Sequence, residues 1–333
     1  MPRIDRLTLP KGYPTPEAME SWGQNESNYD PDLWDLQYLS YRYLGGMTEG
    51  DLRKRHDAIV RNMPSYTDPA RDVIPIHSYQ SSWYWFRKEY QTRLEFALRE
   101  IELPEMTLQP PVANRLGLSQ LRVPNGTDVI FRYGERKHMR QMVQDGSVRF
   151  SPAESYDGEE NNEARRDDEL QKHAYMPGQY TTIIHESGQR IPVIEDVQHT
   201  VGGPRYHLVC FSCVWDPQLF EEFGADTCVA VTEPREFARR IGEAGKDVFP
   251  GWYFLDCPVQ YFDPYERLKN EFFDAGMSKD LRYAYQNEFR ILWSQMRATP
   301  IDRHQIVNIG PVYDIMTMYD INGREIPLRG RNT

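Results

Sequence analysis

The hydrophobic pattern of this chain changes from a helical period to a strand period near residue 125. Between residues 30 and 103, apolar and aromatic residues recur every three or four positions, whereas short apolar runs separated by turn residues follow Asn125-Gly126. Three prolines within LPEMTLQPPVANRLGL interrupt both patterns. In a chain of 333 residues, this change predicts a helical N-terminal region at 1–110, a linker at 111–124 and a second domain at 125–333.

The N-terminal region is expected to hold three helices after an irregular arm. The first begins at about Asp30 and ends at Gly45-Gly46; its apolar face is formed by Leu33, Leu36, Leu39 and Tyr43, with Trp34, Tyr38 and Tyr41 beside it. Thr48 caps a second helix that ends near Met63, and a long helix is expected at 76–103. Helices so rich in aromatic residues must bury much of their surface, so we expect this region to pack on the second domain.

The second domain is expected to mix strands and helices. Strands are predicted at residues 128–133, 148–151, 181–184, 190–194, 206–212, 227–231, 252–256, 288–293, 305–309 and 315–319, and helices at 135–144, 234–242 and 265–275. Their irregular alternation indicates an α+β fold with a mixed sheet rather than a regular series of βαβ units.

Composition narrows the classes of function. No run approaches the roughly 18 uncharged apolar residues of a membrane span, and the first residues lack the apolar run of a signal peptide, so we expect a cytoplasmic protein. The net charge of -11 disfavours non-specific coating of a polyanion, although the basic run at 132–140 leaves room for a local basic groove. No metal is expected.

The cysteines allow one minor alternative. Cys210 and Cys213 form a CxxC pair, which is typical of zinc or thiol chemistry, but a complete site would need His207 as well. The surrounding LVCFSC is also the pattern of a buried strand, and we favour that interpretation. The motifs of dinucleotide-binding folds, P-loops, α/β-hydrolases and zincins do not occur in the sequence.

Four segments carry a resemblance. They are Phe131-Arg132-Tyr133, the run from Val148 to Pro152 that continues to Tyr156, Cys210-Phe211-Ser212, and Asn287-Glu288-Phe289-Arg290-Ile291. In this order they resemble a bacterial ADP-ribosyltransferase-like domain family of the Arg-Ser-Glu type, over residues 125–320. The resemblance implies a mixed-sheet ADP-ribosyltransferase-like catalytic domain that follows the helical region, with NAD as the substrate.

The resemblance also implies roles for individual residues. Glu288 corresponds to the catalytic acid, and Gln286, two residues earlier, to the residue that helps to select the acceptor. Cofactor-binding roles fall to Arg132 on the dinucleotide, Ser151 at the nicotinamide side, Tyr133 and Tyr156 as stacking rings, and Arg165 on phosphate. Cleavage of the nicotinamide bond passes through an oxocarbenium-like state, which a carboxylate such as Glu288 can stabilise.

Structural interpretations compete with these roles. Glu288 has Arg290 two positions along the same strand, so it could serve only in an ion pair. The charge run at 161–170 is interpreted as the solvated start of a helix, although Arg165 and Asp168 could instead belong to an active-site loop. Both interpretations can be tested once the strands are placed.

The leading hypothesis is therefore transfer of ADP-ribose from NAD to a macromolecule, as in intracellular bacterial toxins or antiphage effectors. RNA or DNA is favoured over protein as the acceptor, and a neutralising antitoxin protein is a possible partner. The alternative is a non-catalytic binding module of the same fold, in which Glu288 is structural.

Overall fold

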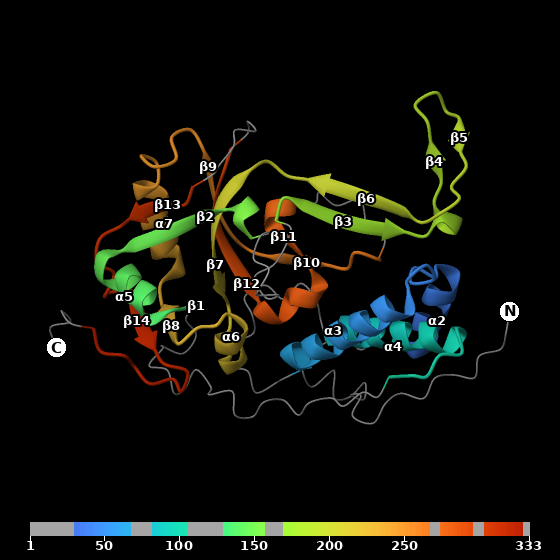
Figure 1. Cartoon of the computed structure of the whole chain (residues 1–333), viewed down its shortest axis with the longest axis horizontal. Helices are drawn as coiled ribbons and strands as arrows, with labels where there is room; N and C mark the ends of the chain where they lie inside the picture. The colour runs from blue at the N-terminus through green and yellow to red at the C-terminus, as the bar shows by residue number, and fades with distance from the viewer. Residues whose placement is uncertain are drawn as a thin grey trace.

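The computed structural model describes residues 30–67, 82–104, 129–156, 169–266, 274–295 and 303–328. Within them the chain has an α+β fold, which confirms the predicted class, but the strands of the large sheet pair antiparallel rather than forming the predicted mixed sheet (Figure 1). The predicted arm and the linker at 111–124 lie outside the described residues.

The elements alternate irregularly along the chain. The helices are α2 (Pro31–Ser40), α3 (Glu49–Thr67), α4 (Ser82–Leu98), α5 (Arg136–Asp145), α6 (Pro217–Glu222) and α7 (Pro234–Ala244), and the 3-10 turns are η3 (Ala153–Ser155), η4 (Gly178–Tyr180), η5 (Ala275–Met277) and η6 (Leu281–Gln286). The strands are β1 (Ile130–Gly134), β2 (Ser147–Pro152), β3 (Gln171–Met176), β4 (Ile183–Ile184), β5 (Arg190–Ile191), β6 (Val197–Gly202), β7 (Tyr206–Ser212), β8 (Thr227–Val231), β9 (Tyr253–Pro258), β10 (Gln260–Phe262), β11 (Ser278–Asp280), β12 (Glu288–Ser294), β13 (Gln305–Asn308) and β14 (Met316–Tyr319).

The large sheet splits beside its central strand, β7. On one side, β12 pairs with all seven residues of β7 and then with the edge strand β9. On the other side, β2 pairs with His207 and Leu208, whereas β1 pairs only at Ser212 and leads on to β8 and β14. The two groups of strands therefore diverge along the middle of β7.

Apolar side chains fill both faces of this sheet. On one face, α5 and α7 contribute Met139, Val143, Phe237 and Ile241 to the largest buried cluster. On the other face, rings of β1 pack against Trp215 and the residues of α6. Because both faces are covered, the strands read as nearly continuous apolar runs, as the burial of every residue of β8 illustrates.

The predicted buried face of the first helix is wrong. Leu33, Leu36 and Leu39 are 43%, 67% and 36% exposed, whereas Trp34 and Tyr38 are almost fully buried. The aromatic pair forms the stripe that faces the core because each ring removes more apolar area from water than a leucine does. The helix also ends at Ser40, before Gly45, and Arg42, just beyond it, donates two hydrogen bonds to Glu95 on α4.

The three N-terminal helices pack on the second domain, as the sequence predicted. Trp34, Ile59, Met63 and Trp85 share a buried cluster with Leu281 and Ala284 of η6. Asn62 of α3 also donates a hydrogen bond to the carbonyl of Arg282, over 3.2 Å. Since η6 ends at Gln286, the helical region lies directly behind the segment that leads into Glu288.

A buried ion cluster reinforces this contact. Asp263, just after β10, accepts two hydrogen bonds from Arg55 of α3, at 2.8 and 2.6 Å, and lies 2.7 Å from the ammonium of Lys88 on α4. Lys88 also lies 2.5 Å from Glu266. Lys88 is 0% exposed and Asp263 3% exposed, so these charges depend on one another for their compensation.

The sequence did not predict a long ribbon of two antiparallel strands. Strands β3 and β6 pair over residues 171–176 and 197–202 and carry the predicted hairpin of β4 and β5 at their far end (Figure 1). Exposed polar side chains alternate irregularly in β6, so its pattern has no clear period of two. The helix predicted at 265–275 falls mostly on residues outside those described, and Ala275 begins a 3-10 turn instead.

Candidate functional site

Three adjacent strands carry an acid, a hydroxyl and a base. Glu288 at the start of β12 lies opposite Ser212 at the end of β7, and Phe131 of β1 pairs with Ser212 from the other side. Arg132 follows Phe131 on β1. The predicted Ser151 lies on β2 opposite Leu208, so Ser212 is the serine in register with Glu288. This arrangement gathers Glu288, Ser212 and Arg132 near the point where the sheet splits.

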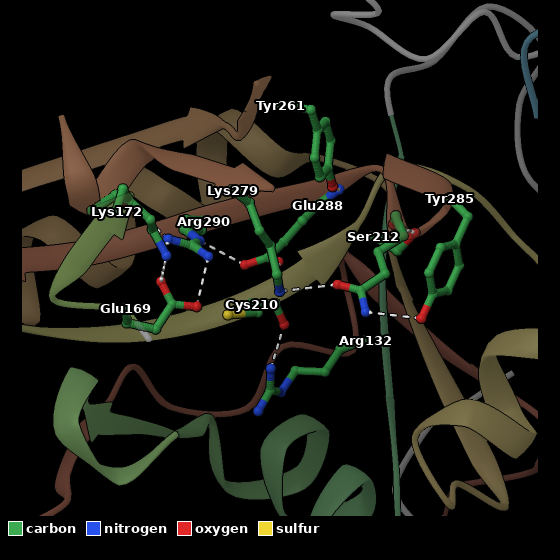
Figure 2. A network of polar contacts seen from close by, with 12 residues as sticks. Arg132, Glu169, Lys172, Cys210, Ser212, Tyr261, Lys279, Tyr285, Glu288 and Arg290 are labelled. Atoms are coloured by element: carbon green, nitrogen blue, oxygen red, sulfur yellow. Dashed lines mark hydrogen bonds and ion pairs between the residues drawn. The ribbon is translucent and has the colours of Figure 1, made fainter. Parts of the chain in front are cut away.

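Both oxygens of the Glu288 carboxylate are bound by cations (Figure 2). Lys279 of β11 donates to Oε2 over 2.9 Å, and Nε of Arg290 donates to Oε1 over 2.6 Å. Burial alone would raise the pKa of Glu288, but attraction to Arg290 and Lys279 outweighs it and holds the pKa well below its usual range. Glu288 therefore remains an anion, suited to stabilising positive charge and poorly suited to accepting a proton.

Glu169 extends the cluster on the far side of Arg290. One of its oxygens accepts a hydrogen bond from the guanidinium over 2.8 Å, and the other lies 2.7 Å from Nη1 of Arg290 and 3.1 Å from the hydroxyl of Tyr206. Glu169 is only 2% exposed and Lys172 lies 3.9 Å from it. The prediction of a solvated run at 161–170 is thus wrong at Glu169, because the buried guanidinium of Arg290 requires a second carboxylate.

The backbone bends sharply just before Glu288. Asn287 has a φ of 42° and a ψ of 55°, the left-handed region that asparagine tolerates better than most residues. Its neighbour Gln286 accepts a hydrogen bond from Lys279 over 3.0 Å, and the hydroxyl of Ser212 donates to the Gln286 carbonyl over 2.6 Å. The bend therefore turns both Gln286 and Glu288 toward Lys279, which links their side chains.

The hydroxyl of Tyr261 fixes the other side of this bend. It accepts a hydrogen bond from the backbone N–H of Glu288 over 2.8 Å. Tyr261 lies on β10, which pairs with the strand that carries Lys279. Strand β10 thus positions both the backbone and the main cationic partner of Glu288.

Arg132 reaches into the split of the sheet. Its guanidinium donates to the carbonyl of Cys210, between the points where β2 and β1 join β7 (Figure 2). The Tyr156 hydroxyl bonds Ser151 and lies in the electrostatic field of Arg132; burial, chiefly, raises the Tyr156 pKa. Three predicted cofactor-binding residues, Arg132, Ser151 and Tyr156, therefore lie around the split.

The structure does not bring Tyr133 to this cluster. Its ring packs with Trp215 and Phe220, and its hydroxyl donates to the carbonyl of Val214 over 2.8 Å. Phe131 is in register with Ser212 and Glu288, so alternation along β1 places Arg132 on the other face of the sheet, where its guanidinium lies over the ring of Phe211. Tyr133 shares the face of Glu288, but its ring and hydroxyl are engaged by other residues. Arg165 and Asp168 lie outside the described residues.

Sequence reasoning missed several residues of the site. Lys279 and Tyr261 lie in stretches for which the sequence predicted no helix or strand, and Glu169 lies in the run predicted to be solvated. Among the partners of Glu288, only Arg290 could be placed beside it from the sequence, because residues two positions apart on a strand share one face. The others meet Glu288 through contacts between segments far apart in the chain.

The cysteines lie within or beside the same strands. Burial raises the pKa of the Cys210 thiol, and it raises that of Cys257 to about 11. Cys213 is also buried. Within the described ranges, no group of three or more His, Cys, Asp or Glu is arranged to hold a metal ion.

We predict that the thiols of the native protein react slowly. At pH 8, a thiol of pKa about 11 is ionised in only about one molecule in a thousand, and the thiolate is the reactive form. Titration with an aromatic disulfide reagent should therefore be slow in the native protein and should release all 4 thiols after denaturation. Rapid reaction of Cys210 in the native protein would restore thiol chemistry as a candidate.

Comparison with known proteins identified no relative of this chain. Neither the family models, nor the curated proteins, nor the solved structures gave a match to this chain. In the part of the chain that the structure describes, no helix is both long and apolar enough to cross a membrane.

Proposed function

We propose that the protein transfers ADP-ribose from NAD to a macromolecule. The observation that carries the proposal is the placement of Arg132, Ser212 and Glu288 on three adjacent strands, with the acid held as an anion. The resemblance to Arg-Ser-Glu transferases requires this order of base, hydroxyl and acid. Ser212 takes the place that the sequence assigned to Ser151.

The chemistry requires an anion beside the reacting carbon. The bond between the ribose anomeric carbon and the nicotinamide nitrogen breaks, and its electron pair stays with nicotinamide, which leaves neutral. The sugar carries a developing positive charge that Glu288 stabilises. A lone pair of the acceptor then forms the new bond to the anomeric carbon, and the acceptor releases its proton. Because its pKa is depressed, Glu288 acts through its charge.

Arg132 and Tyr156 supply binding around the split of the sheet. A guanidinium is planar and matches the oxygens of a pyrophosphate, so Arg132 binds the dinucleotide in this proposal. Tyr156 lies near it and offers a ring to the nicotinamide side. The acceptor is RNA or DNA in preference to protein, and a neutralising antitoxin would act from outside the cluster.

A second candidate function follows from the burial of the same acid. Glu288 is 5% exposed and both its oxygens are bound by Lys279 and Arg290. A buried carboxylate with both oxygens bound by cations can have a purely structural role, as in a non-catalytic binding module. NAD would have to displace part of this network to reach Glu288, and a structural ion cluster would not permit that.

Labelled NAD separates the two candidates. The purified protein is incubated with NAD that carries label in either the nicotinamide or the adenylate, together with bacterial RNA, DNA or soluble protein. A transferase releases labelled nicotinamide and incorporates the adenylate label into one fraction. If the wild type neither releases nicotinamide nor incorporates the adenylate label, the binding module is the remaining candidate.

We predict that Arg132→Ala raises the KM for NAD about tenfold, equivalent to about 1.4 kcal/mol, with a smaller effect on kcat. A clamp on the pyrophosphate binds the ground state and the transition state alike, so its loss appears in KM. Steady-state nicotinamide release measures both constants. Arg140→Ala, an exposed arginine of α5, is the control and should change neither. Equal KM values for Arg132→Ala and the wild type would dismiss the clamp.

A further inference from the structure

The side-chain amide of Gln286 is held from both ends. Its oxygen accepts from Lys279 over 3.0 Å, and its nitrogen donates to the hydroxyl of Tyr285 over 3.3 Å. An amide presents an acceptor on one side and donors on the other, and a rotation of 180° exchanges them. The two contacts therefore fix which side of Gln286 faces Glu288.

Tyr285 is held in turn by two helices. Its hydroxyl lies 3.3 Å from Oε2 of Glu222, the last residue of α6, and Glu222 forms an ion pair with Arg61 of α3. The guanidinium of Arg61 also stacks over the Tyr285 ring, 3.9 Å from its centroid. Both contacts of the hydroxyl, at 3.3 Å, are longer than ordinary hydrogen bonds, so the stacking by Arg61 supplies much of the restraint.

These contacts form a continuous series from the surface to the acid. Arg61 and Glu222 have side chains that are 39% and 22% exposed. The series then passes through Tyr285, Gln286 and Lys279 to the buried carboxylate of Glu288. A change in the ion pair of Arg61 with Glu222 can therefore be transmitted to Glu288 through the contacts of Tyr285, Gln286 and Lys279.

We propose that Tyr285 is a positioning residue for Gln286, and that the ion pair of Arg61 with Glu222 holds Tyr285 so that the helical region selects the acceptor. The selection rests on the proposed transfer of ADP-ribose. Gln286 lies two residues before Glu288, and a fixed amide accepts only nucleophiles whose donor and acceptor groups complement it. A rotated or mobile amide loses that discrimination while leaving the charge of Glu288 in place.

The first experiment measures the ratio of transfer to cleavage. Tyr285→Phe removes only the hydroxyl, and Arg61→Met removes the stack and the ion pair. Transfer of labelled ADP-ribose to bacterial RNA, DNA and soluble protein is divided by the release of nicotinamide. We expect both variants to lower the ratio about tenfold, the size of one lost polar contact of about 1.4 kcal/mol. An unchanged ratio would overturn the acceptor role.

Two matched controls accompany these variants. Tyr253→Phe removes a hydroxyl from an exposed tyrosine of β9, and Arg53→Met removes a guanidinium from α3 that pairs with Glu49 on the same helix. Both should leave the ratio as in the wild type. A fall in the ratio for either control would show that the assay reports general damage, and would count against the specific role of Tyr285.

The second experiment is independent of NAD. In protein labelled with nitrogen-15 at glutamine, the side-chain signals of Gln286 are identified by their loss in Gln286→Leu. Arg61→Met leaves Lys279 and Tyr285 in place as partners of Gln286, yet it should shift these signals and speed their exchange with water, as Tyr285→Phe should. Unchanged signals in Arg61→Met would overturn the positioning role, even in an active enzyme. Shifted signals in a protein that never cleaves NAD would support the positioning role and refute the transferase.

Discussion

Replacing Glu288 with Gln will reduce the release of nicotinamide from NAD by about 10² to 10³-fold, the range expected when one electrostatic stabiliser of a transition state is removed. The amide keeps the shape of the side chain and can still contact Lys279 and Arg290, but it carries no charge to stabilise the oxocarbenium-like sugar. The loss should appear in kcat more than in KM, because the charge of the sugar develops only in the transition state. Single-turnover release of labelled nicotinamide measures it directly.

Stability must be measured beside activity in this variant. Breaking a buried ion pair by neutralising one partner costs about 3 kcal/mol or more, so Glu288→Gln will also lower the midpoint of urea unfolding. Glu169→Gln is the matched control, since it weakens the same network on the other side of Arg290. We expect it to lower stability with a much smaller loss of cleavage. Equal losses of cleavage in both variants would mean that Glu288 acts only through the fold.

The strands that position the site could be predicted from the sequence because their patterns are local. The bounds predicted for β7 and β8 agree with the structure, since each is a run of apolar residues between polar turns. Glu288 and Ser212 were both placed on strands, but their register was not predicted. Pairing between strands is set by contacts over the whole domain, so the choice between Ser151 and Ser212 required the fold.

The charged partners of the site could not be predicted for a different reason. Nothing in the sequence distinguishes a buried lysine or glutamate from an exposed one. The burial of Lys88, Lys279 and Glu169 is determined by their neighbours in space. Lys279 and Glu288 are nine positions apart in the chain, whereas Asp263 and Arg55 are 208 positions apart. A charge in a sequence does not show whether its partner is water or a distant carboxylate.

Asp263→Asn will destabilise the protein by about 3 to 5 kcal/mol at pH 7, because it leaves the buried guanidinium of Arg55 without its carboxylate. The same change loosens the contact between the helical region and β10, whose Tyr261 holds the backbone of Glu288. Urea unfolding followed by tryptophan fluorescence measures the loss. Glu49→Gln, which opens an exposed pair with Arg53 on α3, should cost less than about 1 kcal/mol. Similar losses of unfolding free energy in the two variants would show that the buried ion cluster contributes no more to stability than an exposed ion pair.

The pH dependence of the same variant tests the charge of Asp263. Burial alone would raise the pKa of Asp263, but attraction to Arg55 and Lys88 outweighs it and holds the pKa far below the ordinary value. The stability that this carboxylate contributes is therefore fully present above the unfolded pKa of about 3.9, and it is lost as the pH falls toward the folded pKa. The difference between wild type and Asp263→Asn should narrow below pH 4 by nearly 1.4 kcal/mol per pH unit, because the unfolded wild type binds a proton that its folded form does not. A difference that stays constant between pH 7 and pH 3 would mean that Asp263 is not held as an anion, and the helical region would then be anchored to the site by its apolar contacts alone.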